Sequence, residues 1–306
     1  MDKYKDCACE LGESCIDVAH PRYLKKPILY PKGMKIALVQ MSVGADKAAN
    51  ISEAVKLIHQ AKELGAQLVA LPECFNSPYG TKYFPQYAEE VPSGETSRAL
   101  SRAAAEAGVC VVGGSVPERC GSKLYNTCTV WDDAGKLLAQ HRKMHLFDID
   151  IPNQITFKES EVLSGGNQLT TFEYLGIKVG VGICYDLRFP EMAHIMAQKG
   201  CSLLVYPGAF NMTTGPRHWE LLARARATDQ QLWVALVSPA RDPEADYVAW
   251  AHSTLVDPWG QVVAKLDDKP GTLVADIDVK TVEQVRSQIP IRSQRRTDIY
   301  DIVSKQ

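Results

Sequence analysis

The stretch GIKVGVGICYDLRFPE, from Gly176 to Glu191, decides the fold and the chemistry of this 306-residue chain. Side chains alternate between the two faces of a strand, so the branched residues within 177–183 would point into a core. Gly180, Gly182 and Cys184 would share the opposite face, and glycines below a thiol leave room for another chain segment or a ligand. A proline then fits the first turn of a helix. The stretch predicts a buried strand, a turn that carries Cys184, and a helix.

A cysteine on a strand-to-helix turn is well placed for nucleophilic catalysis. The turn presents the thiol at the rim of a sheet, and backbone amides of the turn can face an oxyanion. Most free cysteines, however, are small buried apolar residues with no chemistry. From this segment alone, both interpretations of Cys184 stay open.

Apolar runs and helical patterns alternate on both sides of this stretch. Their periods predict buried strands at 35–40, 67–71, 109–112, 201–206 and 232–237, and helices at 46–64, 96–107, 190–199 and 216–230. A hairpin is predicted at 124–131 and 136–141, and further strands at 249–256, 261–266 and 272–277. No linker or repeat interrupts the pattern, so residues 34–306 form one predicted α/β domain whose helices cover sheets.

Residues 1–33 lack any sustained period and contain three prolines. We expect an extension that is flexible or lies on the surface. Cys7, Cys9 and Cys15 are close in sequence, but a metal site would need a fourth nearby ligand that the segment lacks. The sequence therefore predicts neither a metal site nor a cofactor.

Charge and composition exclude several classes of protein. The 34 basic and 36 acidic residues leave a net charge of -2, which argues against electrostatic binding to nucleic acid or to an anionic membrane. No apolar run is long enough to span a bilayer. The chain has nine cysteines, an odd number, and its first thirty residues contain no apolar segment typical of a secretory signal. A reduced chain in the cytoplasm is the prediction, with a mitochondrial pool left open.

Two other strand ends carry charged residues. Glu73 follows the buried run 68–71 and a proline, and Lys143 follows the run 137–142. An acid, an ammonium group and the Cys184 thiol, each at the end of an apolar run, can converge on one rim of a sheet. His141 and His145 lie on either side of Lys143, and we interpret both as surface or packing residues.

This trio resembles the nitrilase (carbon–nitrogen hydrolase) superfamily with its Glu-Lys-Cys triad. The matching motifs are Leu71-Pro-Glu73, the segment HRKMHLFDID around Lys143, and Gly182-Ile-Cys-Tyr-Asp186. The likeness extends from about Met34 to Tyr300. It implies a four-layer α-β-β-α sandwich, in which helices cover two mixed sheets, and a homodimer that pairs through its helices.

The resemblance also implies a role for each site residue. Glu73 would be the general base for the Cys184 thiol, which attacks an amide carbon and forms a thioester. Lys143, together with the backbone N–H of Tyr185, would hold the oxyanion, and its charge would lower the pKa of the thiol. Glu159 matches the second glutamate of the family and would position Lys143 or the substrate amide.

Within the superfamily, the segments FDIDIP (147–152), FKES (157–160), YPGAFNMTTGP (206–216) and YVAWAHS (247–253) resemble the ω-amidase branch. That branch hydrolyses short amides such as α-ketoglutaramate and α-ketosuccinamate. Arg188 is the candidate for binding the substrate carboxylate, with Phe210, Thr214 and Tyr125 in the pocket.

Two other functions stay open at this stage. A sister branch acts on deaminated glutathione and shares the segment CYDLRFPE. The chain could also be a thiol-bearing binding or redox-sensing protein that is not an enzyme. The complete trio Glu73, Lys143 and Cys184 argues against that last function.

Overall fold

Two β-sheets form the centre of the structure, a computed structural model that describes residues 33–305. The seven-stranded sheet has the order β15-β1-β2-β3-β5-β4, with β6 paired to β5. Its strands are β1 (Met34–Gln40), β2 (Leu68–Ala70), β3 (Cys110–Val112), β4 (Val116–Cys120), β5 (Lys123–Trp131), β6 (Leu137–Arg142) and β15 (Gly271–Ile277). The six-stranded sheet runs β14-β13-β12-β11-β10-β9 and contains β9 (Thr170–Tyr174), β10 (Ile177–Val181), β11 (Leu203–Pro207), β12 (Trp233–Val237), β13 (Thr254–Val256) and β14 (Val262–Lys265).

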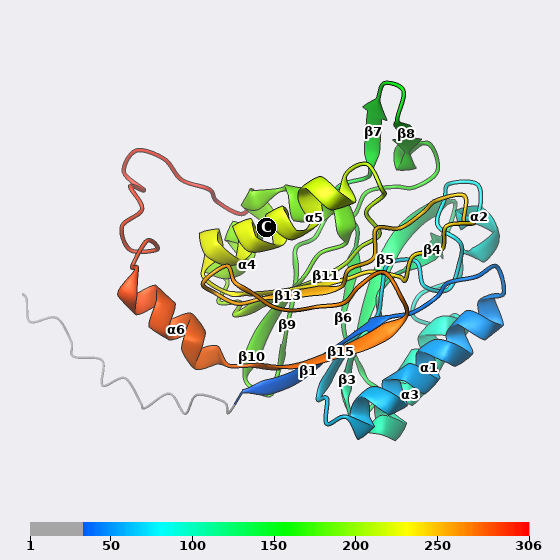
Figure 1. Cartoon of the computed structure of the whole chain (residues 1–306), viewed down its shortest axis with the longest axis horizontal. Helices are drawn as coiled ribbons and strands as arrows, with labels where there is room; N and C mark the ends of the chain where they lie inside the picture. The colour runs from blue at the N-terminus through cyan, green and yellow to red at the C-terminus, as the bar shows by residue number, and fades with distance from the viewer. Residues whose placement is uncertain (1–32, 306) are drawn as a thin grey trace, which may run out of the picture.

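Helices cover the outer face of each sheet (Figure 1). The pair α1 (Lys47–Glu63) and α3 (Glu95–Ala107) packs on one face of the seven-stranded sheet, and the other face of that sheet packs against the six-stranded sheet. On the far side, α4 (Pro190–Gln198) and α5 (Gly215–Gln230) pack on the six-stranded sheet. The predicted four-layer α-β-β-α sandwich is confirmed. None of the helices within residues 33–305 combines the length and the apolar character needed to cross a bilayer.

Local sequence signals explain where the helices begin and end. The side chain of Asp46 accepts a hydrogen bond from the backbone N–H of Ala49 at 3.0 Å and so caps the first turn of α1. Helix α3 ends at Gly108, whose φ of +60° favours glycine. Both boundaries agree with the predicted helices 46–64 and 96–107 to within one residue.

Several elements were missed or misplaced by the sequence analysis. The missed ones are β4, β9, the short helix α2 (Phe84–Tyr87), helix α6 (Val279–Gln288), and the hairpin of β7 (Asp148–Ile151) and β8 (Ile155–Lys158). This hairpin, which projects from the body in Figure 1, has the alternating pattern of DIDI and ITFK around a Pro-Asn turn, a signal that could have found it. The strand predicted at 249–256 was too long. Ala251 and His252 have positive φ values of 63° and 61°, which interrupt the extended backbone before Thr254.

The predicted extension 1–33, with its three cysteines, lies outside the described residues except for Gly33.

Gly182 packs tightly behind the turn that carries Cys184. A Cβ atom at this position would lie 2.5 Å from Cε1 of Tyr206, and that ring is only 1% exposed and has no space to move. We expect Gly182→Ala to lower the free energy of unfolding by about 1–3 kcal/mol, because overpacking a rigid core displaces its neighbours. Thermal or urea unfolding measures this change.

Gly44→Ala is the matched control. Gly44 has no heavy atom within 4 Å of its ideal Cβ position, so this variant should have the same free energy of unfolding as the wild type. Equal stability of both alanine variants would contradict the tight packing of Gly182.

Candidate active site

The three charged or nucleophilic residues of the predicted trio converge, but from two sheets rather than from one. Glu73 follows β2, and Lys143 follows β6 in the same seven-stranded sheet. Cys184 follows β10 of the facing sheet. The expectation of a single sheet rim was therefore wrong, because strand ends of the two stacked sheets meet at the same end of the sandwich.

Cys184 begins the short 3₁₀ turn η2 (Cys184–Arg188), between β10 and α4, as the sequence predicted. Its φ of +46° lies in the left-handed region, which is strained for a residue with a side chain. Gly208 packs closely against this turn, since its ideal Cβ position is 3.3 Å from the Cα of Cys184. The turn thus presents the thiol at the end of the strand, the geometry that suits a nucleophile.

Glu73 lies at the centre of the polar contacts and is buried. Its Oε1 accepts hydrogen bonds from Lys143 Nζ at 3.0 Å and from Asn126 Nδ2 at 2.9 Å. Its Oε2 accepts from the backbone N–H of Ala209 at 2.8 Å. The carboxyl group also lies near enough to the Cys184 thiol for each group to shift the pKa of the other. Glu73 is therefore held in place near the sulfur, as a general base must be.

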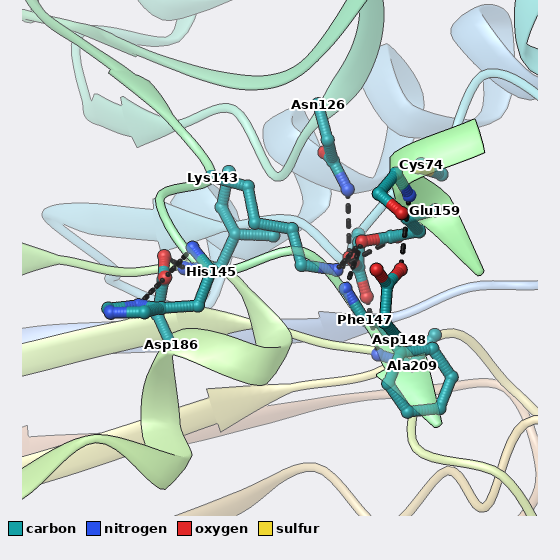
Figure 2. A network of polar contacts seen from close by, with 12 residues as sticks. Cys74, Asn126, Lys143, His145, Phe147, Asp148, Glu159, Asp186 and Ala209 are labelled. Carbon is teal, nitrogen blue, oxygen red and sulfur yellow. Dashed lines mark hydrogen bonds and ion pairs between the residues drawn. The ribbon is translucent and has the colours of Figure 1, made fainter. Parts of the chain in front are cut away.

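Lys143 lies between two carboxylates, as Figure 2 shows, and is buried. Its Nζ is 3.0 Å from Oε1 of Glu73 and 2.9 Å from Oε1 of Glu159. Glu159 begins the 3₁₀ turn η1 (Glu159–Glu161) and accepts two further hydrogen bonds, from the N–H of Phe147 at 2.7 Å and from the hydroxyl of Tyr79 at 2.8 Å. Glu159 therefore contacts the ammonium group directly, which is the geometry that positioning of Lys143 requires.

Burial and charge shift the pKa of each member of the trio. Burial raises the pKa of Glu73, and Lys143 opposes part of this shift. For Lys143, burial acts to lower the pKa, but Glu159 and Glu73 outweigh it and raise the pKa well above its usual value. Burial and then Glu73 raise the pKa of the Cys184 thiol, against the opposing effect of Lys143. The charge of Lys143 lowers the thiol pKa, as expected, but burial and Glu73 outweigh it and the net shift is upward. A neighbouring base that takes the proton during the attack would offset this shift.

Asp186 connects the turn of Cys184 to the segment of Lys143. Its carboxylate accepts from the N–H of Ile183, from the N–H and Nδ1 of His145, and from Nε2 of His141 at 3.0 Å. Hydrogen bonds from both histidines overcome burial and lower the pKa of Asp186. His141 is buried and bonded and so is a packing residue, not a surface one.

Two pockets adjoin the trio. A cavity of about 250 Å³ opens beside Glu73, Cys74 and Tyr79. A narrower pocket contains Cys184 itself, and its lining is Phe147, Cys184, Tyr185, Arg188, Ala209, Phe210, Thr214 and Tyr247. Ala209 and Tyr247 line both pockets, and the Tyr247 hydroxyl donates to the carbonyl of Ala209 at 2.6 Å. The structure therefore brings Arg188, Phe210, Thr214 and Tyr185 to the nucleophile, as predicted.

Tyr125 is not part of this group. Its ring stacks on the guanidinium group of Arg142, 3.9 Å from the ring centroid, and it lines neither pocket. Its neighbour Asn126 contacts Glu73, so the alternation of side chains along β5 turns Tyr125 to the opposite face of the strand. The structure therefore does not place Tyr125 beside the nucleophile with the other predicted pocket residues.

Arg188 has an unusual environment for a half-buried cation. Its guanidinium carbon lies 5.4 Å from the ring centroid of Tyr185 and 4.7 Å from that of Phe210. The buried Nε atom has no hydrogen-bond partner within residues 33–305, and no carboxylate of that range pairs with the group. Asp186, the partner in the alternative structural interpretation, binds the two histidines instead. Burial lowers the pKa of Arg188.

Sequence reasoning missed the polar residues that orient the trio: Asn126, Tyr79 and Tyr247. Each is a polar residue within an apolar or loop segment, and no spacing in the sequence links it to Glu73 or Glu159. Within residues 33–305, no group of three His, Cys, Asp or Glu side chains is arranged to hold a metal ion.

Comparison with known proteins gives consistent results. A family model described as carbon-nitrogen hydrolase matches residues 35–287. Omega-amidase NIT2 of Xenopus tropicalis is 58% identical over 271 residues, which cover 89% of this chain and 98% of that protein. The human Omega-amidase NIT2 is 53% identical with the same coverage. The crystal structure of Saccharomyces cerevisiae Nit3, described as a member of branch 10 of the nitrilase superfamily, has 42% sequence identity and a TM-score of 0.80, covering 87% of this chain and 97% of that one.

Proposed function

The chain belongs to the carbon–nitrogen hydrolase family, and from this premise we propose that it is an ω-amidase that releases ammonia from short amides with a carboxylate at the far end, such as α-ketoglutaramate. The resemblance to the nitrilase superfamily that the sequence indicated is confirmed. The relatives named omega-amidase, which match over almost their whole length, support the choice of this branch.

The observation that carries the proposal is the unpaired cation beside the nucleophile. Arg188 lines the same narrow pocket as Cys184, and its charge is not matched by a carboxylate within residues 33–305. Partial burial removes water from the guanidinium group without supplying a counter-ion, and the carboxylate of a ligand would offset this cost. A substrate with an amide at one end and a carboxylate at the other supplies the electrophile for Cys184 and the anion for Arg188.

In the first half-reaction, Glu73 accepts the thiol proton as the sulfur of Cys184 attacks the amide carbon. The C–S bond forms while the carbonyl π-bond opens, and the oxyanion is stabilised by Lys143 and by the N–H of Tyr185. Glu73 then donates its proton to the amide nitrogen. The C–N bond breaks, ammonia leaves, and a thioester remains on Cys184.

In the second half-reaction, water replaces ammonia at the carbonyl carbon. Glu73 takes a proton from this water as its oxygen attacks the thioester, and Lys143 again faces the oxyanion. When the C–S bond breaks, the sulfur regains a proton and the carboxylic acid leaves. Asn126 and the N–H of Ala209 support this role of Glu73, because their hydrogen bonds leave the carboxyl group little freedom to turn away from the sulfur.

A side-by-side assay tests the choice of substrate. Ammonia release is measured from α-ketoglutaramate, succinamate and deaminated glutathione. The cavity of about 250 Å³ beside Glu73 is smaller than most ligand pockets, which span ~300–1,000 Å³, and this favours the short amides. Faster turnover of deaminated glutathione would assign the chain to the sister branch instead.

Arg188→Ala separates substrate binding from chemistry. We expect kcat/KM for α-ketoglutaramate to fall roughly 10²-fold, because a desolvated charge pair contributes about 2–5 kcal/mol. An uncharged short amide should lose far less, and lysine at position 188 should recover only part of the loss because it lacks the planar fork. Steady-state kinetics on both amides and a melting curve of the same preparation check this. Equal losses on both amides together with a lower Tm would mean that Arg188 only holds the turn.

A homodimer in the cytoplasm, with or without a mitochondrial pool, is also part of what we propose. The helical face of α4 and α5 supports the dimer. Leu221 of α5 is 61% exposed, and Tyr300 lines a surface hollow together with Pro190 and His194 of α4. Light scattering after gel filtration measures the mass, and fractionation of cells measures the compartment.

A further inference from the structure

The first turn of α5 contacts the side chain of Arg188. The Nδ1 atom of His218 lies 3.1 Å from Nη1 of Arg188. A guanidinium group can only donate hydrogen bonds, so Nδ1 must be the acceptor and the ring proton must be on Nε2. Burial, then Arg188 and Arg217, lower the pKa of His218, which favours the neutral ring that this contact requires.

Several residues contact the guanidinium group of Arg188, but within residues 33–305 only the hydrogen bond to His218 fixes its direction. The rings of Tyr185 and Phe210 lie against the guanidinium group at 5.4 and 4.7 Å and limit where it can move. Stacking of this kind leaves the group free to rotate within the plane. The hydrogen bond to His218 removes that freedom, because it engages Nη1.

Helix α5 also holds the backbone beneath Arg188. Two residues of the turn, Leu187 and Arg188, accept hydrogen bonds through their carbonyls from the side chain of Arg226, each at 3.0 Å. Arg226 is eight residues after His218, about two turns along the helix. One helix therefore fixes both the main chain and the side chain of Arg188, so its cation has a defined direction before any substrate binds.

We propose that His218 is a positioning residue for substrate selection: as a neutral acceptor on Nη1, it aims the free edge of the Arg188 fork at the carboxylate of the ω-amide. This inference rests on the proposed function and deepens it. His218 does not touch the reacting atoms. It acts only on substrates that carry the distal carboxylate, because only these use the fork.

Two near-isosteric variants test the proposal. His218→Asn keeps an oxygen close to the position of Nδ1, whereas His218→Leu has the same size without an acceptor. For His218→Leu we expect KM for α-ketoglutaramate to rise about tenfold or more with kcat changed less than about twofold, because a hydrogen bond to a charged group contributes about 1.5–3 kcal/mol. The KM for an uncharged short amide should change far less. His218→Asn should recover most of the loss.

A matched control and a double mutant complete the test. His59→Leu makes the same change on α1, where His59 contacts Glu106 at 3.6 Å, and should leave both substrates unaffected. In the double variant with Arg188→Ala, the change from histidine to leucine should raise KM little further, since the guanidinium group that His218 orients is absent. Full additivity of the two changes, or equal KM increases on charged and uncharged amides, would overturn the positioning role.

The wild-type rates keep this inference distinct from the function itself. If the wild type releases ammonia from no ω-amide, the proposed function fails. If it does so and His218→Leu behaves as the wild type, the proposed function stands and the role of His218 is wrong.

Discussion

We expect Cys184→Ala to abolish ammonia release while the protein still folds, because replacing a thiol by a hydrogen on Cβ removes the proposed nucleophile and little volume. The rate of ammonia release should fall to the uncatalysed rate in buffer, which is a larger loss than we expect for any other single substitution. Cys184→Ser should be nearly as inactive, since a hydroxyl is far harder to ionise than a thiol, and burial already raises the pKa at this position. Initial rates and circular dichroism of the purified variants check both statements.

Mass spectrometry gives an independent test of the same residue. Wild-type protein quenched during turnover should have an acyl group on Cys184 and on none of the eight other cysteines. Substantial activity of Cys184→Ala, or an acyl group elsewhere, would place the nucleophile at another residue.

Lys143→Arg lowers kcat by about 10²–10³, the loss expected when one donor to an oxyanion is removed. The space around Nζ is defined by Glu73 and Glu159 at 2.9–3.0 Å, and a planar guanidinium group is too large for it. The arginine keeps the positive charge, so a loss of rate here reports geometry rather than charge. Single-turnover kinetics measure the step directly.

Lys56→Arg is the control for this substitution. Lys56 lies on the exposed surface of α1 beside Glu53, and its replacement should leave the rate unchanged. A near-normal kcat for Lys143→Arg would contradict the oxyanion role and leave Glu73 and Cys184 as the functional pair.

The regular elements could be predicted because their signals are local. Helix α1 has a capping aspartate, an apolar period of 3.6 and a glycine after its last turn, all within one segment. The positions of Glu73, Lys143 and Cys184 were predictable for the same reason, since each follows an apolar run and lies in a short motif. The α6 helix was missed, although Asp278 caps its N-terminus, because it directly follows a strand without an intervening turn signal.

The contacts of the site could not be predicted, since they join residues far apart in the chain. Asn126 is 53 residues from Glu73, and His218 is 30 residues from Arg188. Neither pair has a spacing that a helix or a strand would explain. The site residues come from two sheets because of how the layers stack, and the sequence of a single strand does not predict that stacking. The rise in the pKa of Cys184 follows from burial, which only the folded structure defines.

The burial that raises the pKa of Cys184 also bears on its reaction with oxidants. Peroxides and alkylating agents react with thiolates, and a sulfur that retains its proton is a poor target for both. Burial gives the resting Cys184 this protection, together with Cys74, Cys110, Cys128 and Cys201, whereas Cys120 is exposed. Among residues 33–305, we therefore expect an added peroxide or alkylating agent to modify the exposed Cys120 before the buried Cys184. The burial that surrounds the proposed nucleophile would then also limit its side reactions between turnovers.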